Sequence, residues 1–81
     1  MLSIITVTYN NFDDLYRTLN SLNKVKGIEK VVVNGGDCGK TKEYLSAFDG
    51  IAISEPDKGI SDAFNKGVSH ANGDNLMFLN S

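Results

Sequence analysis

The chain has 81 residues, with 8 basic and 10 acidic side chains and a net charge of −2, so we expect one small domain covering residues 1–81. The balanced charge excludes the basic footprint of a nucleic-acid-binding protein, and no apolar run approaches the roughly 18 residues of a membrane-spanning helix. The single cysteine, Cys38, has no partner for an internal disulfide. These features predict a cytoplasmic protein with no direct membrane segment and no nucleic-acid partner.

Four short apolar runs are the first candidates for regular structure. They are nearly continuous, and the first three are rich in β-branched residues, as expected for strands that are buried on both faces of a parallel sheet. The runs occupy residues 2–7, 30–33, 51–54 and 76–79.

Three stretches with helical spacing lie between these runs, at residues 12–22, about 41–48, and 60–71. The first has Asn10 or Asn11 as its candidate N-cap, and the third has the clearest amphipathic pattern. Gly73 is placed to end the third helix in a left-handed conformation.

Strands and helices therefore alternate, which implies an α/β fold with a parallel sheet and right-handed crossovers. The simplest doubly wound solution has strand order 3-2-1-4, with two helices on one face and one on the other. The last strand then lies at an edge with apolar residues pointing both ways, and one face is under-covered. We expect either a homodimer through this uncovered face or, as the end at Ser81 favours, the first part of a larger domain.

The stretch "VVVNGGDCGKT", residues 31–41, resembles a phosphate-binding P-loop. That motif needs a glycine five places before its Gly-Lys-Thr, where this chain has Asn34. It is also partnered by an apolar strand that ends in a magnesium-binding Asp, which neither later run supplies. The context therefore disfavours a P-loop hydrolase.

In open α/β sheets, ligands bind beyond the carboxyl ends of the strands, where the strand order reverses. The residues expected there are Thr8, Tyr9, Asn10, 34–37, 55–59, Asn80 and Ser81. From the residues alone, Asn10 fits a helix cap as well as a ligand contact, Tyr9 fits packing at the sheet end, and Asp57 fits a turn. His70 fits a structural role at the end of the third helix. No catalytic set and no metal-ligating cluster can be assembled from the candidates.

Three segments together resemble the N-terminal part of a family 2 glycosyltransferase with the GT-A fold. "SIITVTYNN" is similar to the opening strand of that family, and "VVVNGGDCGKT" to its second strand and Asp-Gly-Gly-Ser turn. "SEPDKGISDAFNKGVSHANGDNLMFLNS" resembles the family's Ser-Glu-x-Asp-x-Gly-Ile-Tyr-Asp-Ala-Met-Asn-Lys-Gly stretch and the following strand, which ends in Leu-Asn-Ser. The resemblance implies a three-layer, Rossmann-like parallel sheet that forms an incomplete GT-A domain.

The resemblance implies that the chain binds a nucleotide-diphosphate sugar, linked to UDP, GDP or dTDP, for transfer to an acceptor hydroxyl in polysaccharide or glycan biosynthesis. Thr8 and Tyr9 match positions that contact the nucleobase, while Asn34 and Asp57 match acidic residues that contact the nucleotide. With the neighbouring Asn10 and Lys58, these residues form the predicted nucleotide-binding set.

Two departures from the family pattern qualify this interpretation. Asn34 replaces the usual Asp, so a charged hydrogen-bond acceptor becomes a neutral one. The Asp-x-Asp motif that holds Mg²⁺ or Mn²⁺ in the complete family enzyme follows the Leu-Asn-Ser strand, and the sequence stops at Ser81. We therefore expect no metal in this chain, a donor-binding half that is inactive alone or, as the alternative, a non-catalytic nucleotide-binding or dimerising assembly module.

Overall fold

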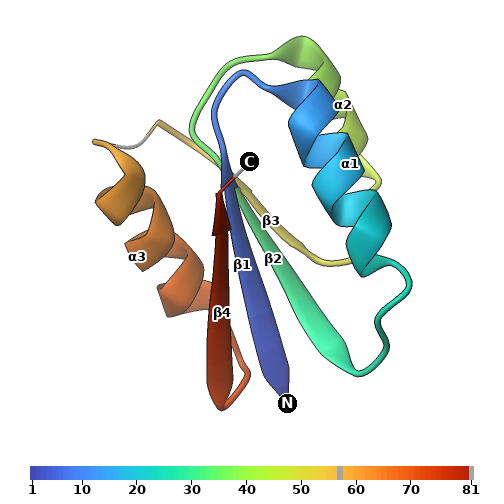
Figure 1. Cartoon of the computed structure of the whole chain (residues 1–81). Coiled ribbons are helices and arrows are strands. Elements are labelled where there is room, and N and C mark those ends of the chain that lie inside the picture. The colour runs from blue at the N-terminus through green and yellow to red at the C-terminus, as the bar shows by residue number, and fades with distance from the viewer. Residues whose placement is uncertain (57, 81) are drawn as a thin grey trace.

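The computed structural model describes residues 1–56 and 58–80, which form four strands and three helices in alternation (Figure 1). In chain order the elements are β1 (Leu2–Thr8), α1 (Phe12–Leu22), β2 (Ile28–Asn34), α2 (Gly39–Ser46), β3 (Ile51–Ser54), α3 (Ile60–His70) and β4 (Asn75–Asn80). Each predicted run and helical stretch is present, with end points shifted by at most a few residues.

The sheet is entirely parallel, with strand order β3-β2-β1-β4, as predicted. The two central strands are buried along most of their length, because helices cover them on both sides. In Figure 1, α1 and α2 lie together on one side of the sheet and α3 lies on the other. The predicted three-layer α/β architecture is therefore confirmed.

The core has two parts, one on each face of the sheet. On the face covered by α1 and α2, Leu15 and Leu19 of α1 pack on Ile4 and Val32 of the central strands. On the other face, Ala63 of α3 packs on Val7 and Val33 near the carboxyl ends of these strands. Because the side chains of a strand alternate between faces, one strand serves both parts of the core.

The loop from β1 to α1 contains both residues that were candidates for the N-cap of α1, and they take different roles. Asn11 is the N-cap of α1, and its side chain accepts a long hydrogen bond of 3.5 Å from the Asp14 N–H. Asn10 instead adopts a positive φ of 49°, which asparagine tolerates better than most residues. Asn10 is thereby turned toward the loop that follows β2.

The prediction for Gly73 was wrong. Helix α3 ends at His70 with Ala71 in an extended conformation, and the glycines with positive φ among the described residues are Gly27 and Gly59. Gly73 is needed for close packing, since a Cβ there would collide with the Ser3 side chain and the backbone of the first residues. Gly73 thus allows a close approach of two backbone segments and does not form a left-handed helix end.

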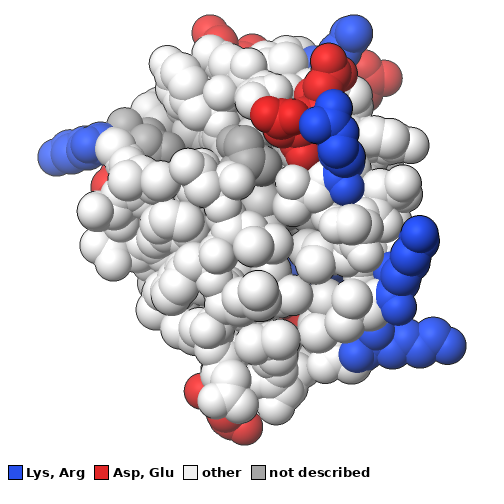
Figure 2. All heavy atoms as spheres, viewed as in Figure 1, with Lys and Arg blue, Asp and Glu red and all other residues white. Residues whose placement is uncertain are grey.

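Strand β4 lies at the edge of the sheet, as predicted, and exposes apolar side chains on both faces. Met77 and Phe78 are 47% and 48% exposed, although Phe78 makes an edge-to-face contact with Phe64 of α3. Figure 2 shows that the surface over β4 is largely uncharged and that charged side chains lie around the margin of this face.

Candidate functional site

The carboxyl ends of the strands meet at one edge of the sheet. Thr8 is in register with Asn34, Asn34 with Ser54, and Val7 with Asn80. Two pockets open at this edge, and Tyr9 lines both of them. Tyr9 is 67% exposed, so its side chain is not packed at the end of the sheet.

The first pocket, called the turn pocket here, has a volume of about 290 Å³. It lies between Tyr9, the glycine turn after β2, and the end of β3 with the segment that follows. Its polar lining includes Asp37, Lys42, Ser54 and Glu55. The lining thus combines residues with carboxylate, hydroxyl and ammonium groups and one aromatic residue.

The second pocket, called the helix pocket, has a volume of about 390 Å³ and lies between the ends of β1 and β4 and the start of α3. Its lining includes Asn80 and, at the start of α3, Gly59, Ile60 and Ala63. The N-cap is Gly59, which has no side chain to cap the helix. The positive end of the helix dipole therefore borders this pocket.

Asn10 fixes the glycine turn. Its Oδ1 accepts hydrogen bonds from the backbone N–H groups of Asp37 at 3.0 Å and Cys38 at 3.1 Å. The backbone of Gly36 lies so close that a Cβ there would collide with the Asn10 side chain and approach its backbone nitrogen. Asn10 therefore acts on the shape of the turn pocket in this structure.

Asn34 is completely buried at the end of β2. Its Oδ1 accepts a hydrogen bond of 3.1 Å from the Gly36 N–H, and its Nδ2 donates a long one of 3.5 Å to the Ser54 hydroxyl. The first of these bonds forms the local turn that asparagine and aspartate favour. The amide of Asn34 thus joins the ends of β2 and β3.

Thr8 is also buried, with 4% of the residue exposed, and it contributes to the lining of the helix pocket. Its hydroxyl has no hydrogen-bond partner among the described residues. The backbone oxygen of Thr8 accepts a 3.0 Å hydrogen bond from the Gly35 N–H, which begins the glycine turn.

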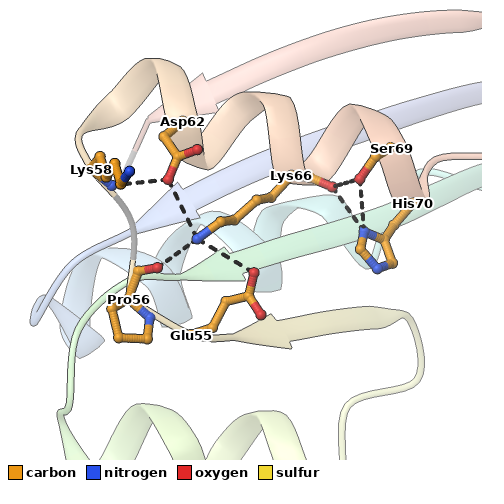
Figure 3. A network of polar contacts seen from close by, with 7 residues as sticks. All are labelled: Glu55, Pro56, Lys58, Asp62, Lys66, Ser69 and His70. Carbon is orange, nitrogen blue, oxygen red and sulfur yellow. Dashed lines mark hydrogen bonds and ion pairs between the residues drawn. The ribbon is translucent and has the colours of Figure 1, made fainter.

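The segment between β3 and α3 supplies the remaining wall of the site. The Lys58 N–H donates to Oδ2 of Asp62 at 2.9 Å, and Lys66 of α3 contacts Glu55, Pro56 and Asp62 (Figure 3). The hydrogen bond from Lys58 lowers the pKa of Asp62, and the nearby ammonium of Lys66 adds to this effect. Asp57, which the sequence marked as a nucleotide contact, lies outside the described residues.

Sequence reasoning did not single out Lys42, Asp62 or Lys66. The spacing of Asp62 and Lys66, four residues apart on a helix, was a signal for an ion pair but gave no sign of contacts with a preceding loop. His70 lies at the end of α3, as expected, with Nδ1 at 2.9 Å from the Lys66 backbone oxygen.

The Gly-Lys-Thr part of the P-loop imitation lines neither of the two pockets. Gly39, Lys40 and Thr41 form the first turn of α2, where Thr41 is fully buried. Lys40 lines a different cavity, which also contains Phe12 of α1.

The described part of the chain shows neither a metal-binding cluster nor a membrane-spanning helix. Residues 1–56 and 58–80 contain no group of three His, Cys, Asp or Glu side chains arranged to hold a metal ion. None of the helices in this part is long and apolar enough to cross a lipid bilayer.

Comparison with known families shows the relationship that the motifs indicated. The model of the family described as glycosyl transferase family 2 matches residues 3–81. The chain belongs to glycosyl transferase family 2. The predicted family is therefore confirmed, and the alternating parallel fold agrees with an N-terminal part of its GT-A domain.

Two relatives of this family 2 chain come from two strains of Mycobacterium tuberculosis, and each is named an uncharacterized glycosyltransferase. Each is 44% identical to the chain over 85 residues, which cover 98% of this chain and 32% of the relative. The chain thus spans about a third of the length of the curated relatives it matches. No solved structure gives a significant match.

Proposed function

We propose that this chain binds the nucleotide of a nucleotide-diphosphate sugar at the carboxyl edge of its sheet. The complete protein would transfer the sugar to an acceptor hydroxyl in polysaccharide or glycan biosynthesis. Membership of glycosyl transferase family 2 supports glycosyl transfer. The observation that carries the donor-binding assignment is the pair of pockets at this edge that are both lined by Tyr9, a largely exposed residue.

The turn pocket suits the base and ribose. The ring of Tyr9 offers a stacking face, and the oxygen atoms of Asp37 and Ser54 are acceptors for base N–H groups and ribose hydroxyls. Lys42 adds a hydrogen-bond donor at the same pocket, beside the carboxylates of Asp37 and Glu55. The candidate donors are sugars linked to UDP, GDP or dTDP.

The helix pocket suits the diphosphate and the sugar. Anions bind at helix N-termini because backbone N–H groups and the helix dipole both favour negative charge. The start of α3 borders this pocket, and Asn80 at the end of β4 also lines it. A donor that spans both pockets would pass over Tyr9.

The other predicted site residues take two kinds of role in this proposal. Asn10 and Asn34 shape the turn pocket through the hydrogen bonds described above, and Thr8 stays a predicted contact of the donor. Asp57 and Lys58 are assigned to the nucleotide by the family resemblance.

The divalent cation of the complete family enzyme, Mg²⁺ or Mn²⁺, does not fit the described residues, since they offer no cluster of ligands for it. We propose that it is held elsewhere in the complete protein, and we route no step of donor binding through it. With a labelled nucleotide sugar, we expect the 81-residue chain to form no transfer product by itself.

The test is calorimetric titration of the chain with UDP, GDP and dTDP. Replacing Tyr9 by Ala is expected to weaken binding about tenfold, because one base stacked on an aromatic ring is worth about 1–3 kcal/mol. Replacing Asp57 by Ala should weaken binding as well, because the family resemblance assigns this carboxylate to the nucleotide. The control is His70→Ala, which removes a ring from the far end of α3. Equal losses in all three variants would contradict this location of the site.

A dimerising module is the second candidate, favoured by the exposed apolar side chains of β4. Replacing Phe78 by Ser would then dissociate a dimer, as measured by sedimentation velocity over a range of concentrations. A monomer that is independent of concentration in the unmodified chain would remove this candidate.

A further inference from the structure

Lys66 makes three contacts with oxygen atoms around the segment that joins β3 to α3 (Figure 3). Its Nζ donates to the backbone oxygen of Pro56 at 2.5 Å and lies 3.4 Å from a carboxylate oxygen of Glu55 and 3.4 Å from one of Asp62. A lysine ammonium has three N–H donors, which matches this number of oxygen atoms. Lys66 therefore joins the loop to the helix.

Asp62 extends the same network to the other end of the segment. The carboxylate oxygen that faces Lys66 also accepts the backbone N–H of Lys58 at 2.9 Å. Burial of the Lys66 ammonium opposes its charge, but Glu55 and Asp62 outweigh this effect and raise the pKa of Lys66. The lysine is thus charged throughout the neutral range; it contacts Glu55 and Pro56 directly, and Asp62 connects it to Lys58.

The segment held in this way forms part of both pockets. Glu55 and Pro56 line the turn pocket, and Gly59 and Ile60 line the helix pocket. Gly59 has a φ of 127°, a conformation that other residues rarely adopt. Lys66 itself lines neither pocket.

We propose that Lys66 is a positioning residue for the donor site, because it holds Glu55 and Pro56 against α3 and, through Asp62, also Lys58, and so sets the spacing of the two pockets. This inference rests on the proposed nucleotide function. Without the three contacts the segment would have to be ordered when the nucleotide binds, and this cost would appear as lost affinity.

The test compares Lys66→Met with Lys30→Met. Lys30 is a matched control because it also ion-pairs with an aspartate, Asp49, at 3.2 Å, and its side chain is 14% exposed against 21% for Lys66. It lies in β2, at the opposite end of the sheet. Each variant removes one partly buried ammonium, so the urea midpoints are expected to fall by similar amounts.

For the nucleotide that binds the unmodified chain, the dissociation constant is expected to rise about tenfold in Lys66→Met and less than about twofold in Lys30→Met. Lys66→Arg keeps the charge but presents a planar fork, so we expect an intermediate affinity. Unchanged affinity in Lys66→Met, or equal losses in the two methionine variants, would overturn the proposal.

A second readout separates this inference from the proposed function. Without nucleotide, amide hydrogen exchange at Lys58 is expected to be at least about tenfold faster in Lys66→Met, with exchange at Val32 unchanged. If the unmodified chain binds none of UDP, GDP and dTDP, the proposed function fails. The exchange rate at Lys58 would still show whether Lys66 orders the residues that precede α3. Unchanged exchange at Lys58 would overturn it.

Discussion

The two ends of the sheet use the same kind of contact, a side chain that binds the backbone of a distant loop, with opposite results. At the amino end, Glu29 of β2 accepts hydrogen bonds from the Ser3 hydroxyl at 2.9 Å and from the backbone and side-chain nitrogens of Asn72 at 2.7 and 2.8 Å. The Ser3 hydroxyl in turn accepts the Gly73 N–H at 2.8 Å. These hydrogen bonds join β1, β2 and the loop that precedes β4.

At the carboxyl end, Asn10 binds the backbone of the glycine turn, and Lys66 binds the backbone oxygen of Pro56. Tyr9, which is largely exposed, lines the two pockets at this end. Side-chain contacts of similar chemistry thus stabilise the fold at the amino end and shape the candidate site at the carboxyl end. Variants at the two ends are therefore expected to lose stability alike but to differ in nucleotide affinity.

The largest effects are expected from a pair of glycines, one at each end. A Cβ on Gly36 would meet Asn10, and one on Gly73 would meet Ser3 and the Met1 backbone oxygen. Because such overpacking costs about 1–3 kcal/mol, Gly36→Ala and Gly73→Ala should lower the free energy of unfolding in urea by similar amounts. Gly36→Ala alone should also weaken nucleotide binding. Equal affinity in the two variants would break the distinction between the ends.

A smaller effect is expected at Asn10. Asn10→Ala removes the acceptor for two exposed backbone N–H groups and should cost about 1 kcal/mol of stability, with a further loss of nucleotide affinity. Asn10→Asp is the control, because it keeps an acceptor and tolerates the positive φ. A loss in Asn10→Asp as large as in Asn10→Ala would show that the acceptor is not what orders the turn.

The smallest effect concerns the amino end and depends on pH. The hydrogen bonds from Asn72 and Ser3 lower the pKa of Glu29 from its usual value of 4.5, so the carboxylate contributes stability that is complete above that value and is lost as the pH falls through the lower folded-state pKa. Glu29→Gln should thus be less stable than the unmodified chain at neutral pH.

This difference should shrink as the pH falls below 4.5, as measured by urea midpoints across the acid range. Nucleotide affinity at neutral pH should be unchanged in Glu29→Gln. A stability difference that stays constant into strong acid would show that the charge of Glu29 is not involved.

The sequence allowed the fold to be predicted because buried strands and amphipathic helices leave periodic patterns. The runs at β1 and β2 and the spacing of Leu15 and Leu19 gave the order of elements and the two faces of the sheet. Gly73 was misinterpreted because a glycine after a helix fits both a left-handed turn and a close approach of backbones.

The site was less accessible to prediction. Its shape depends on single contacts between loops, such as Asn10 with Asp37, which are 27 residues apart and leave no periodic trace. Tyr9 was expected at the carboxyl edge from the strand order alone, but its exposure and its place in both pockets depend on how the neighbouring turns are held. Direct contacts of the predicted residues with a nucleotide stay predictions.

The most direct test of the central claim is an amide-shift titration by NMR with UDP, GDP and dTDP. We expect one of them to shift the amides of Tyr9, Gly36 and Gly59, around the two pockets, and to leave Glu29 and Asn72 at the amino end unchanged. No shifts with any of the three, or shifts confined to the amino end, would contradict a donor site at the carboxyl edge of the sheet.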